Sequence, residues 1–244
     1  MRYARYVTVF VLACTLNAVT CAAQKIEKLE LVFAGKKRTV HYFAPSGDKP
    51  LPLVILLHGS NRNGRVMVDE WKSLAAKEQV IVAGPDAIRP ETWLMDQDGT
   101  GFMHEVVKAL NTKRTIDPTR TYIFGHSSGA EFALILGLLE SEYFAAMAVH
   151  AGGLHEENAS VFQYAKRKVP VALWIGDRDP LVPLEPIKKT REMFETRGFP
   201  VTLKVMKGHD HNYYAVSGDL NKEVWAFFKE SALPAPFYQE YLKP

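Results

Sequence analysis

The sequence predicts an α/β fold, with a mostly parallel central sheet of about eight strands and helices on both of its faces. Short, continuous apolar runs recur along the chain, as expected of strands buried on both faces of a parallel sheet. Helical patterns separate most of these runs, which indicates crossover connections between parallel strands. Only about 20 residues lie between the expected strands at 145–149 and 171–175, so we expect no cap domain.

The expected elements begin with a hairpin and continue as strands alternating with helices. Residues 29–34 and 38–43 alternate between apolar and polar side chains, and residues 35–37 join them. Further strands are expected at residues 53–57, 80–83, 122–124, 145–149, 171–175 and 201–206. Helices are expected at residues 66–78, 102–111, 130–140, 185–196 and 220–229. No internal repeat or linker divides the chain, so we expect a single domain over residues 24–244.

A leader precedes this domain. Arg2 and Arg5 are followed by an apolar stretch at 6–19 and by small residues that end at Ala23, which is the pattern of a secretory signal peptide over residues 1–23. The apolar stretch is shorter than an ordinary membrane span of about 20 residues. We therefore expect a secreted or periplasmic protein without stable membrane insertion, with a short membrane anchor as the alternative.

Both cysteines of the chain, Cys14 and Cys21, fall in this leader. Cleavage after Ala23 would leave a mature chain with no disulfide, no thiol nucleophile and no cysteine metal site. The residues around Cys14 also resemble a lipoprotein cleavage site, so a lipid on one of these cysteines is a second alternative.

The charge balance excludes two large classes of partner. The chain has 30 Lys and Arg against 27 Asp and Glu, a net charge of +3, and its longest run of cations is residues 36–38. Nothing in this pattern favours binding to a nucleic acid or to an anionic membrane surface. We expect a monomer or a dimer.

The chemistry-bearing motif follows the expected strand at 122–124. Residues 125–129 read Gly-His-Ser-Ser-Gly and lead directly into a helix, which matches the G-x-S-x-G nucleophile elbow in its strand–turn–helix setting. Ser127 is centred between the two glycines, whereas Ser128 is not. Ser127 is therefore the candidate nucleophile.

A serine hydroxyl needs a base, and the base needs a carboxylate to orient it. In folds that carry this serine motif, the order along the chain is nucleophile, acid and then base, so the base is expected after the last strand. His209 and His211 both lie there, and local chemistry does not separate them. Their H-x-H spacing could also hold a metal, but no cysteine or third ligand is nearby, so we expect neither a metal nor a cofactor. Asp177 and Asp179 follow the strand at 171–175, and Pro180 makes Asp179 the better-positioned acid.

The loop after the strand at 53–57 is expected to complete the site. The backbone N–H groups of Ser60 and Ser128 are candidates for stabilising an oxyanion. His58 precedes the nucleophile and is expected to be structural. Asn61 and Trp93 are candidates for contacts with substrate.

The chain resembles the α/β-hydrolase superfamily and, within it, secreted esterases related to polyhydroxybutyrate depolymerases and to feruloyl and acetylxylan esterases. The resemblance rests on residues 57–59, on Asp-Gly-Thr-Gly-Phe at 98–102, on residues 116–130 with the serine motif, and on Gly-Asp-Arg-Asp-Pro-Leu-Val-Pro at 176–183. It places the acid at Asp179. The ending Asp-His-Asn-Tyr-Tyr at 210–214 is similar to that of the esterase D group, which places the base at His211, with His209 as the rival.

This resemblance implies a serine esterase that hydrolyses small or polymer-linked carboxylic esters through a Ser-His-Asp triad and an acyl-enzyme. A serine peptidase, or a lactone or thioester hydrolase, would use the same residues on the same fold. A non-catalytic binding module descended from the fold is the alternative from a different class of protein.

Overall fold

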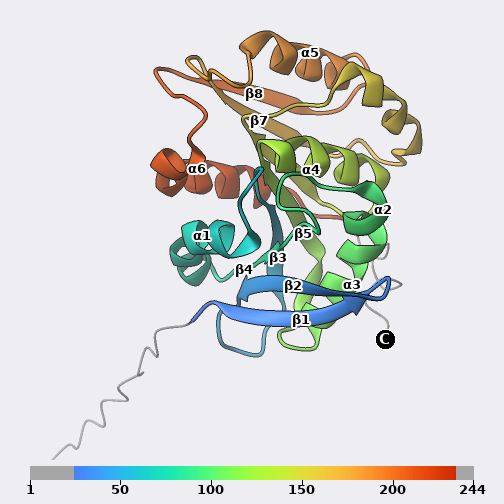
Figure 1. The fold of residues 1–244 in the computed structure, drawn as a ribbon, viewed down its shortest axis with the longest axis vertical. Coiled ribbons are helices and arrows are strands. Elements are labelled where there is room, and N and C mark those ends of the chain that lie inside the picture. Colours follow the sequence, from blue (N-terminus) through green and yellow to red (C-terminus); the bar gives the residue numbers. More distant parts are fainter. Residues whose placement is uncertain (1–24, 235–244) are drawn as a thin grey trace, which may run out of the picture.

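The computed structural model describes residues 25–234 and shows one eight-stranded sheet with helices packed around it (Figure 1). The order of strands across the sheet is β1-β2-β4-β3-β5-β6-β7-β8. The first two pairings, β1 with β2 and β2 with β4, are antiparallel, and all the others are parallel. The predicted fold class, a mostly parallel sheet of about eight strands, is confirmed. The expected leader, with Cys14 and Cys21, lies outside the described residues.

The strands agree with the apolar runs in the sequence, with changes at their ends. Their bounds are β1 Glu27–Phe33, β2 Lys36–Phe43, β3 Leu51–Leu57, β4 Ile81–Pro85, β5 Ile116–His126, β6 Ala146–His150, β7 Val171–Gly176 and β8 Val201–Met206. Every residue of β3, β4, β6 and β7 is buried, which explains why these strands read as unbroken apolar runs. The first turn is shorter than expected, because Ala34 and Gly35 both adopt positive φ and close the hairpin in two residues.

The helices cover both faces of the sheet. They are α1 Gly64–Glu78, α2 Met95–Asp98, α3 Thr100–Asn111, α4 Ser128–Leu139, α5 Leu184–Glu195 and α6 Tyr213–Phe228, with a 3-10 segment, η1, at Glu156–Tyr164. In Figure 1, α1 and α6 lie together on one side of the sheet, and α2, α3 and α4 lie on the other. Between β6 and β7 the chain forms only η1 and short loops, so no cap domain is inserted there.

Two differences from the sequence prediction bear on the site. The short helix α2 falls where the sequence predicts no helix, and α6 begins at Tyr213 rather than near residue 220. The residues Ser217, Gly218 and Asp219 resemble a turn, but the first turn of α6 is held by the burial of Tyr213, whose ring is fully buried against Phe124 and His126. Tertiary packing here overrides local propensity.

No helix within residues 25–234 has both the length and the apolar character that a membrane span requires.

Candidate active site

The turn from β5 to α4 holds Ser127 in a strained conformation. Ser127 has φ 56° and ψ −121°, a region that residues with a side chain rarely adopt. Two glycines allow the tight turn. A Cβ on Gly125 would lie 2.1 Å from the carbonyl oxygen of Gly129, and a Cβ on Gly129 would lie 2.5 Å from that of Leu57. The spacing of the motif therefore reflects close backbone contacts on both sides of the serine.

His211 lies beside Ser127 and Asp179. It sits on the loop between β8 and α6, and its Nε2 is 2.9 Å from the Ser127 Oγ. Its Nδ1 is 2.8 Å from Oδ2 of Asp179. With Nδ1–H donating to the carboxylate, Nε2 of the neutral ring is the acceptor for the serine hydroxyl. This is the hydrogen-bonding order that a general base next to a nucleophile requires.

Asp179 is held so that it can face only the histidine. Its side chain is fully buried, and its Oδ1 accepts hydrogen bonds from the backbone N–H groups of Leu181 and Val182, both at 2.9 Å. The other oxygen is then free for His211. Asp177 plays a different part, because its Oδ1 accepts the N–H of Gly208 and so ties the loop after β7 to the loop after β8.

The rival histidine, His209, points into a buried row of imidazoles. Its Nε2 is 3.0 Å from Nε2 of His150, whose Nδ1 is 3.1 Å from Nδ1 of His126. Burial lowers the pKa of His126 to about 3 and that of His150 to about 2. His126 and His150 are therefore neutral near pH 7. Sequence reasoning missed this row, because its members come from β5, β6 and the loop after β8.

The predicted oxyanion donors flank the serine. Ser60 lies on the loop after β3 and Ser128 at the first residue of α4, and neither backbone N–H forms a hydrogen bond within residues 25–234. The loop after β3 rests on the serine, since a Cβ on Gly59 would lie 3.2 Å from the Cβ of Ser127. Free N–H groups at a helix N-terminus and on an adjacent loop suit the stabilisation of a developing negative charge.

The segment at 86–94 supports this loop from behind. The Trp93 indole N–H donates to the carbonyl oxygen of His58 at 2.9 Å, and His58 Nε2 accepts the N–H of Ala87 at 3.1 Å. The N–H of Asn61 donates to the carbonyl oxygen of Pro90 at 2.7 Å. His58 thus has the structural position that its place in the chain predicts. Three hydrogen bonds join the loop after β3 to this segment.

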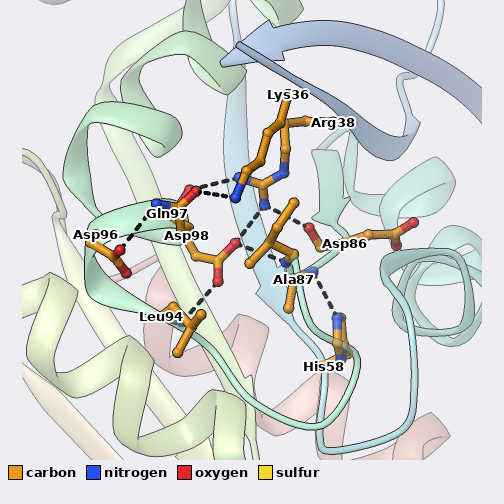
Figure 2. A network of polar contacts seen from close by, with 10 residues as sticks. Lys36, Arg38, His58, Asp86, Ala87, Leu94, Asp96, Gln97 and Asp98 are labelled. Atoms are coloured by element: carbon orange, nitrogen blue, oxygen red, sulfur yellow. Dashed lines mark hydrogen bonds and ion pairs between the residues drawn. The ribbon is translucent and has the colours of Figure 1, made fainter. Parts of the chain in front are cut away.

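A buried ion pair holds the base of the same segment (Figure 2). Arg38 of β2 and Asp98 of α2 are 2.5 Å apart, and their side chains are 2% and 0% exposed. Asp98 also accepts the backbone N–H groups of Ile88 and Leu94, and Arg38 donates to the carbonyl oxygens of Asp86 and Gln97. Both charges are therefore paired and hydrogen-bonded, as burial requires.

The structure corrects the prediction for Trp93. Its side chain is buried, with 7% exposed, and it stacks on Phe132 instead of lining the cleft. The physical reason is the pair of anchors at Asp98 and His58, which turn the ring inward. Asn61 does lie at the cleft, where it adopts a positive φ of 60°.

Two hollows meet at Ser127. The larger, of about 760 Å³, has an apolar wall that includes Leu154, Val182 and Ile187. The smaller, of about 460 Å³, is lined by polar and aromatic side chains, among them His211, Arg62 and Tyr214. Both volumes are in the range of small-molecule sites. Within residues 25–234 no three His, Cys, Asp or Glu side chains are grouped so that they could hold a metal ion.

Known proteins share this fold and part of this sequence. A poly(3-hydroxybutyrate) depolymerase of Ralstonia pickettii is 25% identical over 146 residues, which are 48% of this chain and 30% of that protein. The chain therefore spans less than a third of the length of this relative.

Solved structures match over more of the chain. Fluorophosphonate-binding serine hydrolase F of Staphylococcus aureus superposes with a TM-score of 0.72 at 14% identity, covering 84% of this chain and 98% of its own. A ferulic acid esterase gives 0.67 at 20% identity, with coverages of 84% and 98%. At these identities the likeness establishes the α/β-hydrolase fold.

The family model described as phospholipase/carboxylesterase matches residues 96–217. These residues are half of the chain, and they include Ser127, Asp179 and His211. The chain belongs to the phospholipase/carboxylesterase family.

Proposed function

We propose that this protein is a serine esterase that hydrolyses carboxylic esters through an acyl-enzyme. The observation that carries the proposal is the hydrogen-bonded line from Ser127 through His211 to Asp179, with distances of 2.9 and 2.8 Å. The line lies where two hollows meet and between two free backbone N–H groups. Membership in the phospholipase/carboxylesterase family supports the same chemistry.

In the first half of the reaction, Ser127 Oγ attacks the ester carbonyl carbon while its proton passes to Nε2 of His211. The carbonyl oxygen becomes an oxyanion and accepts hydrogen bonds from the N–H groups of Ser60 and Ser128. Asp179 stabilises the imidazolium that forms. The bond to the alcohol oxygen then breaks, and His211 gives its proton to that oxygen.

In the second half, water replaces the alcohol. His211 takes a proton from the water as the oxygen attacks the acyl carbon, and the bond to Ser127 Oγ breaks. The serine recovers its proton from His211, and the acid product leaves. The cycle returns every group to its starting state and needs no cofactor.

We propose small or polymer-linked esters as the substrates. The absence of an inserted cap between β6 and β7 supports access for an ester group on a chain that extends beyond the site. A relative that is a poly(3-hydroxybutyrate) depolymerase and a structural neighbour that is a ferulic acid esterase point in the same direction.

The test combines labelling with turnover. Wild-type protein should react with a fluorophosphonate probe and hydrolyse p-nitrophenyl acetate, and Ser127→Ala should abolish labelling. Ser127→Ala and His211→Ala should each lower kcat by at least about 10⁴-fold, because the loss of one residue from a catalytic triad removes nearly all of the contribution of the triad to the rate. His209→Gln is the matched control and should retain turnover, since His209 faces His150.

Three outcomes would contradict the proposal. Absence of labelling and turnover in the wild type would favour a binding module. Turnover that collapses in His209→Gln but survives in His211→Ala would move the base. Preferential cleavage of a peptide p-nitroanilide over p-nitrophenyl acetate would make the protein a peptidase.

We also propose that the protein acts outside the cytoplasm. The proposal rests on the leader pattern in residues 1–23. Intact-mass analysis of the exported protein should find a chain that begins at Gln24. A lipid-modified N-terminal cysteine would instead support anchoring, and an uncleaved chain in the cytoplasm would contradict export.

A further inference from the structure

The two hollows at Ser127 are not equivalent in the proposed reaction. His211 must deliver a proton to the alcohol oxygen, so the alcohol part of the ester has to leave on the side where His211 lies. His211 lines the smaller hollow and is not among the residues of the larger one. The smaller hollow is therefore the site for the alcohol, and the larger, more apolar hollow is the site for the acyl group.

A cation stands in the smaller hollow. Arg62 is exposed, and its guanidinium lies over the ring of Tyr214, with the central carbon 5.1 Å from the ring centroid. Within the described chain no carboxylate pairs with this guanidinium and no hydrogen bond uses its N–H donors. Contact with an aromatic face orients an arginine while leaving its N–H groups available to a ligand.

The charge of Arg62 reaches His126, a buried ring beside His211. It contributes, after burial and the nearby His211, to the lowered pKa of His126, the ring that packs 5.1 Å from His211. Two carboxylates lie in the same region. Asp179 is buried and paired with His211, and Asp210 is exposed on the wall of the hollow, where its Oδ1 accepts the N–H of Asn212.

We propose that the smaller hollow binds esters whose alcohol part carries a carboxylate, that is, esters of hydroxy acids, and that Arg62 is the residue that recognises this carboxylate. A guanidinium presents paired N–H donors that match the two oxygens of a carboxylate. Asp210 opposes the same group by repulsion. This inference rests on the proposed esterase function and adds to it the chemical class of the leaving group.

The hollow also limits the size of this alcohol. Its volume of about 460 Å³ accommodates a short hydroxy acid, and Asn61, Asn212 and Tyr214 offer polar contacts around it. An exposed guanidinium–carboxylate contact is modest in strength, and we expect a preference of about fivefold in kcat/KM. Because the contact is exposed, salt should weaken the preference.

The experiment compares matched charged and neutral esters. The substrates are the acetate esters of 2-hydroxypropionate and 3-hydroxypropionate, each with the corresponding uncharged amide, and released acetate is measured for all four. The quantity of interest is the ratio of kcat/KM for the carboxylate ester to that for its amide. Any general effect of a substitution on the chemistry cancels in this ratio.

Substitutions at Arg62 and at Asp210 should move the ratio in opposite directions. Arg62→Gln should reduce it to about one or below, and Arg62→Lys should retain part of it, because a point charge remains without the paired donors. Asp210→Asn should raise it, because the repulsion is removed while an oxygen remains to accept the Asn212 N–H. Both side chains are exposed, so the folded state should tolerate the changes.

The outcomes separate this inference from the function on which it rests. A wild type that hydrolyses p-nitrophenyl acetate but prefers the amides, or a ratio that Arg62→Gln leaves unchanged, would overturn the role of Arg62 and leave the esterase intact. Failure of the wild type to hydrolyse any ester would overturn both. A ratio that falls in Arg62→Gln and rises in Asp210→Asn, with both shifts reduced by salt, would support the carboxylate site.

Discussion

At the scale of single residues, the orientation of His211 depends on which atoms of Asp179 are already occupied. The N–H groups of Leu181 and Val182 hold one carboxylate oxygen, so the other can only face Nδ1 of the histidine. This arrangement sets the tautomer in which Nε2 accepts the serine proton. In the proposed reaction, Asp179 would therefore act through hydrogen-bond geometry as much as through its charge.

This reasoning gives a prediction for Asp179→Asn. The amide oxygen can still accept the Leu181 and Val182 N–H groups, but its NH₂ would then face Nδ1 and favour the wrong tautomer of His211. We expect kcat for p-nitrophenyl acetate to fall by about 10⁴-fold while the protein stays folded. Circular dichroism serves as the control for folding, and activity near that of the wild type would show that Asp179 does not orient the base.

At the scale of elements, the loop after β3 is positioned by a segment distant from the serine. The Arg38–Asp98 pair joins β2 to α2 and holds the start and end of residues 86–94 (Figure 2), and Trp93 and Pro90 then hold His58 and Asn61. The candidate oxyanion N–H of Ser60 lies between these two anchored residues. Rigidity of this loop is what a preorganised oxyanion site needs.

Trp93→Phe tests this support, with Trp225→Phe as the matched control. Both indoles are 7% exposed and donate one hydrogen bond, Trp93 to the His58 carbonyl and Trp225 to Glu78. Trp93→Phe should cost about 1–3 kcal/mol of unfolding free energy, because the buried His58 carbonyl loses its donor, and Trp225→Phe should cost less, because Glu78 is only partly buried.

Only Trp93→Phe should lower kcat, by about tenfold and with little change in KM. This fall is smaller than the loss of about 10²-fold in kcat that follows the removal of an oxyanion donor. Steady-state kinetics on p-nitrophenyl acetate gives both constants. Equal effects of the two variants on kcat would indicate that Trp93 contributes to stability alone.

At the scale of the whole molecule, the parallel strands gather the site at one edge of the sheet. Ser60, Ser127, Asp179 and His211 follow β3, β5, β7 and β8 respectively, and these strands share their direction. Beneath them lies the row of His126, His150 and His209. Because His126 and His150 are buried without charge, the stability of this part of the core depends on pH.

The sign of that coupling can be stated. An unfolded histidine titrates near pH 6.5, whereas the folded-state pKa is about 3 for His126 and about 2 for His150. Below about pH 6.5 the unfolded chain therefore binds protons that the folded chain does not. The free energy of unfolding should therefore decrease as the pH is lowered below about 6.5, by up to about 1.4 kcal/mol per pH unit for each ring.

Urea denaturation between pH 7 and 5 measures this slope before most carboxylates titrate. His150→Gln should reduce the slope of the unfolding free energy against pH. His155→Gln should leave this slope unchanged, because the His155 side chain is 67% exposed. The absolute stability of His150→Gln is not at issue, since only the slope is compared. A wild-type free energy that stays level over this range would contradict the prediction.

The sequence by itself determined the fold class, the strand order along the chain and the serine motif. These features depend on neighbours within a few residues: apolar runs predict β3 to β7, and the glycines around Ser127 follow from the turn between β5 and α4. Predictions from the local sequence were wrong where tertiary packing determined the structure. They placed the start of α6 too late, and they put Trp93 in the cleft.

Only the tertiary structure decided which histidine meets Ser127. His209 and His211 lie on one loop, two residues apart, and local chemistry does not separate them; in the sequence only the resemblance of the ending at 210–214 favoured His211. His211 contacts a serine 84 positions earlier in the chain, and His209 contacts His150, 59 positions earlier. Such pairings arise from the register of β5 to β8 and from the packing of Tyr213, so they exist only once the sheet has formed.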